Sequence, residues 1–184
     1  MTKLIRVLDD YSEFKLNFSI GSHNVILFED DRLKINLIKL IFNMCERNLR
    51  STPYVISGFN LKPYLNLFDN IYDKLSIDLN IKSHHKLTLI RYCEIFDFKN
   101  FNSEFYLLNN FDKLKSMFIV SLFSGNEVVL FDNAYSLEVG DYVEFILDLV
   151  KKFNLFSNRV FIEIKKASHS LNWLAFLYWI YVWI

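Results

Sequence analysis

The sequence predicts an α/β protein built on a parallel sheet, and three observations carry this prediction. Residues 25–28 (Val-Ile-Leu-Phe) and 128–131 (Val-Val-Leu-Phe) are unbroken apolar runs, typical of strands that are covered on both faces. Each run ends at a carboxylate and is followed by apolar residues at helical spacing. A third strand is predicted over 159–164, and a strand, a helix and a strand at this spacing indicate a parallel crossover.

The first third of the chain is expected to form three strands and a helix. Alternating apolar and polar residues predict half-buried strands over 4–7 and 15–20, and Gly21-Ser22 predicts the turn before the covered strand. Three carboxylates follow that strand and suit a helix N-terminus: Glu29, Asp30 and Asp31. The helix is predicted from apolar residues at its spacing: Leu33, Leu37, Leu40, Ile41 and Met44.

The middle of the chain is predicted to be mostly helical. A short strand over 54–56 precedes an amphipathic helix with Pro63 near its first turn. The stripe of that helix consists of Tyr64, Leu65, Phe68, Ile71, Tyr72 and Leu75. Two further helices are expected over 83–96 and 103–122, and Gly125-Asn126 ends the second of them.

The last part of the chain returns to strand and helix. After the strand over 128–132, the best helical stripe in the chain runs from Val139 to Phe153, with Ser136 as its cap. We therefore expect an α/β head made of residues 1–60 and 123–184, with a helical insert at 61–122.

Composition excludes several classes of protein. With 184 residues, 52% of them apolar, the chain can bury the core of one domain. Four Gly and two Pro exclude collagen-like and Pro/Gly-rich disordered chains. Cys45 and Cys93 are expected to be buried helix residues of a cytoplasmic protein, because no secretory leader precedes them.

The net charge of zero hides an uneven distribution. No acid lies between Asp78 and Glu94, a stretch that contains Lys82, His84, His85, Lys86 and Arg91. Residues 101–150 carry two bases and eight acids, and residues 151–184 carry five bases and one acid. Such segregation permits a basic surface on a neutral protein.

An apolar tail over 171–184 contains all three Trp. It is too short to span a bilayer, which takes roughly 20 helical residues. A buried strand is the favoured interpretation, and an interfacial membrane anchor is the alternative; we expect no membrane partner.

The turn after Phe28 occupies the place of a phosphate-binding loop but lacks its chemistry. Aligned on G-x-x-x-x-G-K-[ST], Glu29 stands at the first Gly, and Ile35-Asn36 stands where Lys and Ser/Thr belong. The segment Arg32 to Lys34 lies near the second Gly, and choosing Lys34 as the phosphate lysine places Ile35 at the Mg²⁺-binding hydroxyl. With three carboxylates and no glycine, this loop predicts no bound nucleotide.

Other positions are degenerate in the same manner. Asp132-Asn133 resembles the end of a Walker B strand, with Asn where an ATPase has Glu, although a turn cap explains Asp132 equally well. Residues 108–112 (Leu-Asn-Asn-Phe-Asp) stand where an ABC-type ATPase has L-S-G-G-Q, and Lys165-Lys166 stand where it has its switch His. The order of elements resembles an ATP-binding cassette without its catalytic groups, so we expect a protein that is not an enzyme.

A closer resemblance rests on residues 25–30 leading into their helix, on the helical insert at 87–98, and on the spacing within 126–164. In these stretches the chain resembles the small ring-forming adaptation protein of subtype II-A CRISPR systems. The resemblance implies a degenerate ABC-ATPase-like (P-loop-like) head with a helical leg, assembled as a homotetrameric ring.

The same resemblance implies a function. It implies binding to the ends of linear double-stranded DNA during spacer acquisition in antiviral defence, alongside the integrase and the effector nuclease. It also implies calcium, but residues 80–86 are basic and bear no carboxylate, which argues against calcium dependence here.

The first DNA-binding candidates are Lys82, Lys86 and Arg91, followed by Lys165 and Lys166. Lys and Arg contact phosphate without reading sequence, as a protein that accepts any captured DNA requires. A solvated helix face is the alternative for each residue. For the whole chain, the alternatives are a residual nucleotide-binding protein and a protein-only interaction module that uses the aromatic tail.

Overall fold

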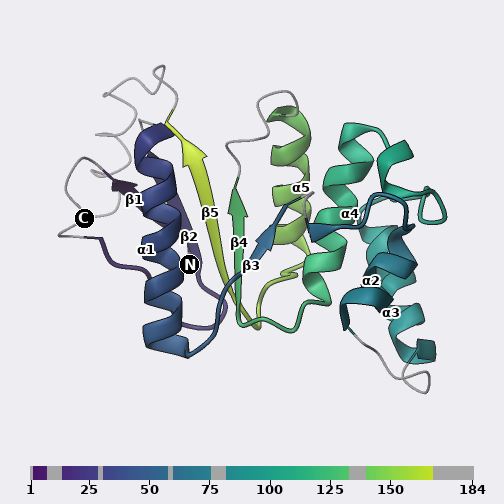
Figure 1. Cartoon of the computed structure of the whole chain (residues 1–184), viewed down its shortest axis with the longest axis horizontal. Helices are drawn as coiled ribbons and strands as arrows, with labels where there is room; N and C mark the ends of the chain where they lie inside the picture. Colours follow the sequence, from purple (N-terminus) through teal and green to yellow (C-terminus); the bar gives the residue numbers. More distant parts are fainter. Residues whose placement is uncertain are drawn as a thin grey trace.

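The computed structural model describes residues 2–7, 14–28, 31–57, 60–75, 82–132 and 140–167. One sheet contains the five strands β1 (Thr2–Val7), β2 (His23–Phe28), β3 (Tyr54–Ile56), β4 (Val128–Asp132) and β5 (Val160–Lys166). The helices are α1 (Asp31–Leu49), α2 (Leu67–Leu75), α3 (Lys82–Ile95), α4 (Asn110–Leu122) and α5 (Gly140–Lys152), with a 3₁₀ turn η3 (Phe105–Leu107) before α4 (Figure 1).

The five described strands all pair in parallel, in the order β1-β2-β5-β4-β3. β5 therefore lies between β2 and β4, with Phe28 opposite Lys166 and Asp132 opposite Ile164. The predicted parallel crossover from β4 through α5 to β5 is confirmed. Because all strands point the same way, β2, β4 and β5 end at one edge of the sheet.

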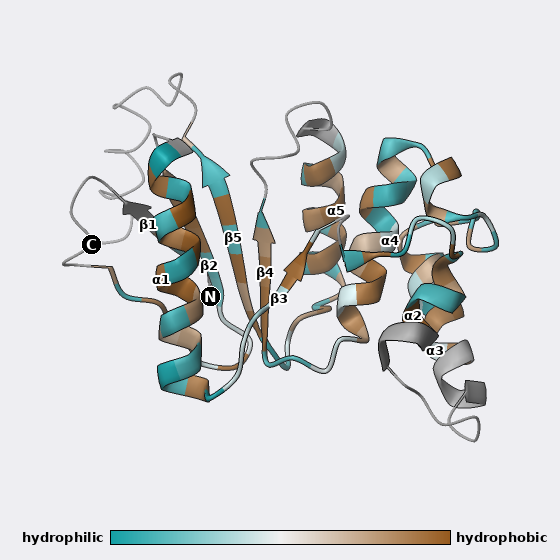
Figure 2. Cartoon of the chain, viewed as in Figure 1, coloured by the Kyte–Doolittle hydropathy of each residue, from teal (hydrophilic) through white to brown (hydrophobic). Residues whose placement is uncertain are grey.

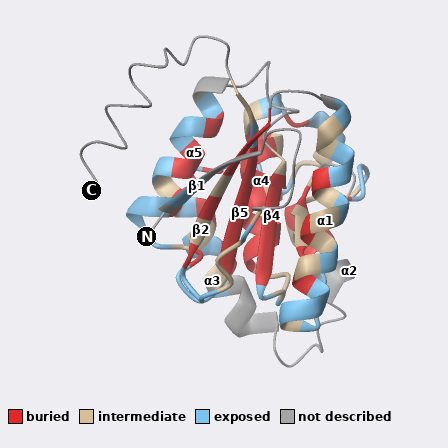
Figure 3. Ribbon diagram, turned by 90° about the vertical axis from the view of Figure 1, so that its left-hand side faces the viewer, coloured by how far each residue is buried: buried red, intermediate tan, exposed pale blue. Residues whose placement is uncertain are grey.

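Helices cover the two faces of the sheet unequally. On one face, α1 is the only described helix, and it packs Leu37, Ile41 and Cys45 onto β2, β4 and β5. On the other face, α4 and α5 pack against β3, β4 and β5, and α2 and α3 extend this core away from the sheet (Figures 1 and 3). Hydrophobic residues therefore run along the central strands (Figure 2), which explains the unbroken apolar runs in the sequence.

The helical segment between β3 and β4 is tied to the sheet by α4. Phe118 of α4 is fully buried, and its ring lies 5.0 Å from the ring of Phe131 in β4 and 6.5 Å from that of Phe161 in β5. α2 and α3 contact α4. The head and insert boundaries stay a prediction, but α4 and the head share one apolar core.

The strand predicted over 15–20 is wrong. The alternating residues Leu16 and Phe18 do pack on the core under α1, but the segment joins the sheet through side chains instead of a ladder of backbone bonds. The amide of buried Asn24 donates to the Asn17 carbonyl (3.0 Å), and its carbonyl oxygen accepts from the Asn17 N–H (3.1 Å). Period-two alternation thus identified an extended, half-buried segment that is not a strand.

Two helices begin later than predicted, in each case at an Asn cap. α2 follows Asn66, whose side chain accepts from the Asp69 N–H (3.0 Å), so Pro63 and Tyr64 lie in the preceding turn. The predicted helix over 103–122 is interrupted after η3, because Asn109 caps α4 by accepting from the Asp112 N–H. Asn competes for backbone donors, which favours caps over helix interiors.

Several remaining predictions are confirmed or lie outside the described residues. Cys45 and Cys93 are buried helix residues, as predicted, and both are free thiols. Ser136, Asn133 and the tail over 171–184 lie outside the described residues. Within the part of the chain that the structure describes, no helix has the length and apolar character needed to cross a bilayer.

Candidate functional site

The edge of the sheet where β2, β4 and β5 end collects several of the predicted site residues. Lys34 lies in the first turn of α1, Asp132 ends β4, and Lys165-Lys166 end β5. In open α/β sheets, ligands bind outside the carboxyl ends of the strands. A phosphate-binding site, if the chain has one, is therefore expected at this edge.

Lys34 and Asp132 form an ion pair at this edge. Lys34 Nζ lies 2.7 Å from Asp132 Oδ2, and the two side chains are only 12% and 9% exposed. The burial of Leu37 and Ile41 fixes the start of α1 over the sheet. The pair consequently reaches from the helix after β2 to the end of β4, across the end of β5 that lies between them.

This ion pair changes what each partner can do. Lys34, which stands at the phosphate-lysine position only in the shifted alignment, already has a carboxylate partner, so an incoming phosphate would have to displace Asp132 or share the ammonium with it. Asp132, at the position of a Walker B carboxylate, is likewise already paired with the Lys34 ammonium. Within this pair, two degenerate nucleotide-binding positions satisfy each other.

The other residues of the predicted loop provide no cradle for phosphate in the described structure. Arg32 and Asn36 are exposed on α1, and Ile35 is 61% exposed. Glu29 and Asp30 lie outside the described residues, and Asp31 starts α1 with its side chain undescribed. The residue at the Mg²⁺-binding hydroxyl position is thus an exposed Ile or Asn, depending on the alignment chosen.

The predicted DNA-binding residues lie in two separate groups. At the end of β5, Lys165 is exposed and Lys166 is half-buried. Arg91 is exposed on α3, which lies on the far side of α4 from the sheet (Figure 1). Lys82 and Lys86 belong to the same helix, but their side chains are not described. The fold does not bring these two groups together into one patch.

Metal-ligating residues do not cluster in the described part of the chain. Across residues 2–7, 14–28, 31–57, 60–75, 82–132 and 140–167, no group of three or more His, Cys, Asp or Glu side chains could hold an ion. The acidic residues Glu29 and Asp30 lie outside these ranges, as do Asp9 and Asp10. The expectation about calcium stays a prediction.

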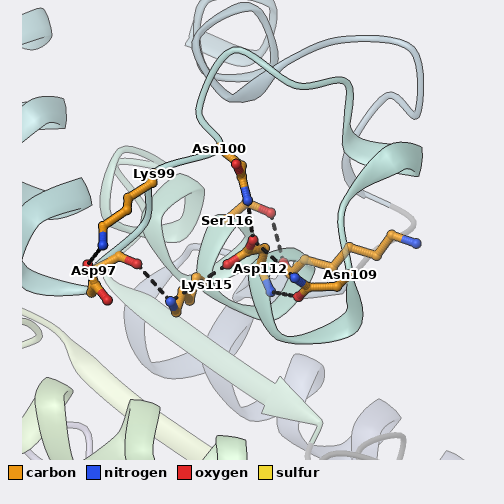
Figure 4. Close-up of polar contacts among 8 residues, drawn as sticks. Asp97, Lys99, Asn100, Asn109, Asp112, Lys115 and Ser116 are labelled. Carbon is orange, nitrogen blue, oxygen red and sulfur yellow. Dashed lines mark hydrogen bonds and ion pairs between the residues drawn. The ribbon is translucent and has the colours of Figure 1, made fainter.

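A second buried ion pair, which sequence reasoning missed, lies in the helical insert (Figure 4). Lys115 of α4 is 4% exposed, and its Nζ lies 3.6 Å from Asp112 Oδ1 on the preceding turn. The ammonium also donates to the Asp97 carbonyl (2.8 Å) and lies 4.1 Å from the centroid of the Phe111 ring. Asp112 accepts from the amide of Asn100 (2.6 Å). A lysine within the apolar stripe of α4 was the available sequence signal.

Arg159, immediately before β5, is a partly buried cation with a structural role. Its guanidinium donates to the Ser121 and Leu122 carbonyls, at 2.7 and 2.9 Å, and so caps the C-terminal end of α4. Burial lowers the pKa of Arg159 from its usual value. The Arg159 side chain therefore connects the C-terminal end of α4 to the start of β5.

The structure is similar to those of ATP-binding cassettes. The dimeric structure of MJ0796, a bacterial ABC transporter cassette, has a TM-score of 0.61 at 14% identity, covering 82% of this chain and 77% of that chain. CbiO1 from Clostridium perfringens, part of the ABC transporter complex cbiONQ, has a TM-score of 0.62 at 11% identity, covering 84% of this chain and 74% of that chain. No protein-family model and no curated protein matches the sequence. The chain has the α/β fold of ABC-ATPase P-loop domains.

Proposed function

We propose that this chain is a non-catalytic protein that uses an ABC-ATPase-like fold to bind linear double-stranded DNA without reading its sequence. The observation that carries the non-catalytic half is the Lys34–Asp132 pair, in which the groups at the phosphate-lysine and Walker B positions neutralise each other. The DNA half is supported by the distribution of bases and by the resemblance to the subtype II-A CRISPR adaptation family.

The turn after β2 lacks the groups that bind a nucleotide. A phosphate loop binds through successive backbone N–H groups, a lysine and a hydroxyl that holds Mg²⁺. This chain has no glycine in the loop, a lysine already paired at 2.7 Å, and Ile or Asn in place of the hydroxyl. Nucleotide binding is therefore unfavourable at this edge. The carboxylates of Glu29, Asp30 and Asp31 in the turn after β2 add repulsion of phosphate.

The basic residues of the chain are the candidates for contact with DNA. The basic residues at the end of β5 and on α3 lie apart, so one copy of the chain contacts phosphate at two separated points. Each Lys or Arg adds a small, salt-dependent contribution. Strong binding accordingly requires several copies, which agrees with the homotetramer that the resemblance implies. Spacer acquisition with the integrase and the effector nuclease in the cytoplasm is the context in which such a protein acts.

Gel retardation tests DNA binding most directly. Linear and closed circular duplexes of one sequence are compared across a salt series. We expect retardation of the linear duplex alone, weakening steeply as salt rises. Equal retardation of both forms, or none at low salt, would contradict the proposal. Lys165→Gln/Lys166→Gln and Arg91→Gln separate the contributions of the two basic groups.

Calorimetry with ATP and Mg²⁺ tests the nucleotide-binding alternative. We expect no heat of binding to the wild-type chain. Micromolar affinity would favour the residual nucleotide-binding protein over our proposal. Asp132→Asn serves as the comparison, because it releases Lys34 from its anionic partner while leaving the loop unchanged.

Deleting residues 173–184 tests the protein-only interaction module. A shortened chain that stays folded and still retards linear DNA agrees with our proposal. A shortened chain that stays folded but no longer retains a protein partner, with no DNA binding in either form, would favour the module instead.

A further inference from the structure

α5 carries apolar residues on two of its sides. Its sheet-facing side buries Val143, Ile146, Leu147 and Val150, which is enough to hold a helix on a sheet. A second stripe follows the spacing i, i+3, i+7, i+11: Tyr142, Phe145 and Leu149 in α5, and Phe153 directly after it, whose N–H donates to the Leu149 carbonyl (3.0 Å). Tyr142, Phe145 and Phe153 remain 47%, 47% and 46% exposed, and Leu149 is half-buried.

One end of this second stripe is held in place by α4. The Phe111 ring stacks on Tyr142 at 4.4 Å and meets Phe145 edge-on at 5.8 Å, yet nearly half of each partner stays open to solvent. Ordered aromatic rings that keep large exposed areas are characteristic of protein interfaces.

Charges beside the stripe are arranged by sign along the helix axis. Along α5, the exposed acids Glu144 and Asp148 precede the exposed bases Lys151 and Lys152 of the last turn. In the described structure, neither Glu144 nor Asp148 forms an ion pair with another residue. Such a distribution is complementary to itself when a copy of the helix is reversed.

The geometry points to a symmetric dimer in which α5 of one copy packs antiparallel on α5 of a second copy. With Leu149 on the twofold axis, Phe145 lies level with Phe153 of the second copy. Lys152 of the second copy lies level with Ile146, two residues from both Glu144 and Asp148, or about 3 Å along the axis from each. A twofold axis places these charges on the same flank of the pair, so each interface contains the arrangement twice.

This interface lies on different residues from the DNA-binding candidates, and it goes beyond the proposed function, which names no surface for self-association. A single helix pair buries less area than a standard interface, so the association is weak by itself. Because exposed acids and bases flank the stripe, the association of two copies depends on the signs of these charges. Because the aromatic stripe buries apolar surface, the association persists at moderate salt.

Mixing two charge-reversed variants tests the pairing. We expect the mass of the full-length wild type, measured by sedimentation, to double over roughly 5–500 µM, the range for a small interface. Lys152→Glu alone, and Glu144→Lys/Asp148→Lys alone, each place like charges together and should stay at the smaller mass. An equimolar mixture of the two restores both charge pairs and should regain the larger mass.

The apolar part is tested with Phe145→Ser, which should lower the mass to that of the unassociated chain. Ile35→Ser is its matched control, because Ile35 is 61% exposed on α1, across the sheet from α5. Circular dichroism confirms that each variant is folded. The inference is overturned if the wild type keeps one mass over the whole range, if Phe145→Ser and the charge variants associate like wild type, or if the mixture does not regain the larger mass. None of these results depends on DNA.

Discussion

The two buried lysine–aspartate pairs of this protein differ in how they are built. Lys115–Asp112 joins two turns of one helix at 3.6 Å and is closed by neighbouring polar groups, among them the Asp97 carbonyl and the Asn100 amide. Lys34–Asp132 joins opposite halves of the chain at 2.7 Å, at the edge where related folds hold their ligand. The insert and the carboxyl edge of the sheet thus each contain a buried lysine–aspartate pair, one formed within a helix and one between distant parts of the chain.

The difference lies in what surrounds each pair. The Lys115–Asp112 pair is surrounded by backbone and amide partners, so it stabilises the insert and leaves little room for a ligand to approach. A pair at the carboxyl edge of a parallel sheet lies where open α/β sheets bind their ligands, so it can affect ligand binding as well as the stability of the fold. Variants of the two pairs should therefore differ in what they affect.

Asp112→Ala has the largest expected effect. It leaves the Lys115 ammonium, 4% exposed, without its carboxylate, and it removes the acceptor of the Asn100 amide. We expect the free energy of unfolding, measured in urea, to fall by about 4 kcal/mol. Asp112→Leu/Lys115→Met should recover most of it, because the buried charges are then both gone. A loss of under about 1 kcal/mol would contradict a structural role for this pair.

Asp132→Leu should cost slightly less, because the Lys34 side chain is 12% exposed and reaches water more easily. We expect a loss of about 3 kcal/mol for either Asp132→Leu or Lys34→Met, and near wild-type stability for the double variant. A double-mutant cycle measures this coupling. Additive losses would show that the two side chains do not stabilise each other.

Thiol labelling separates the two regions. Burial raises the pKa of Cys45 and Cys93 to about 11, with Glu94 adding to the shift at Cys93, so labelling near pH 8 requires local opening. Asp132→Leu should speed labelling of Cys45, on the sheet-facing side of α1, by roughly tenfold or more, since 1.4 kcal/mol of lost protection is a factor of ten. Asp112→Ala should do so for Cys93 in the insert. Equal acceleration of both thiols would mean that the regions open together.

Lys99→Ala should have the smallest effect. Lys99 Nζ lies 3.4 Å from Asp97 Oδ1, but the side chains are 83% and 72% exposed. We expect the free energy of unfolding to change by less than about 0.5 kcal/mol. A larger loss would indicate that Lys99 supports the turn that holds the Asp97 carbonyl against Lys115.

Much of the fold could be predicted because the patterns behind it are local. Apolar runs identified β2 and β4, and helical spacing identified α1 and α5, since both reflect burial of the residues themselves. The strand over 15–20 was mispredicted because alternation reports burial and extension, and cannot report whether backbone bonds or an Asn side chain satisfy the segment.

The candidate site was predictable only in pieces. Lys34 and Asp132 were both singled out from sequence as degenerate positions, but nothing in their local patterns indicated that they meet. Lys115 and Arg159 were overlooked because a single charge in an apolar stretch does not show which carbonyls or carboxylates surround it.

The sequence by itself determined the α/β class, the main strands and helices, and the loss of a glycine-rich phosphate loop, because each depends on neighbouring residues alone. Only the tertiary structure decided that β5 lies between β2 and β4, that Lys34 and Asp132 pair, and that the second stripe of α5 stays exposed. Strand order and ion pairs join residues far apart in the chain within a few ångströms, and periodicity, a local property, contains no record of those distances.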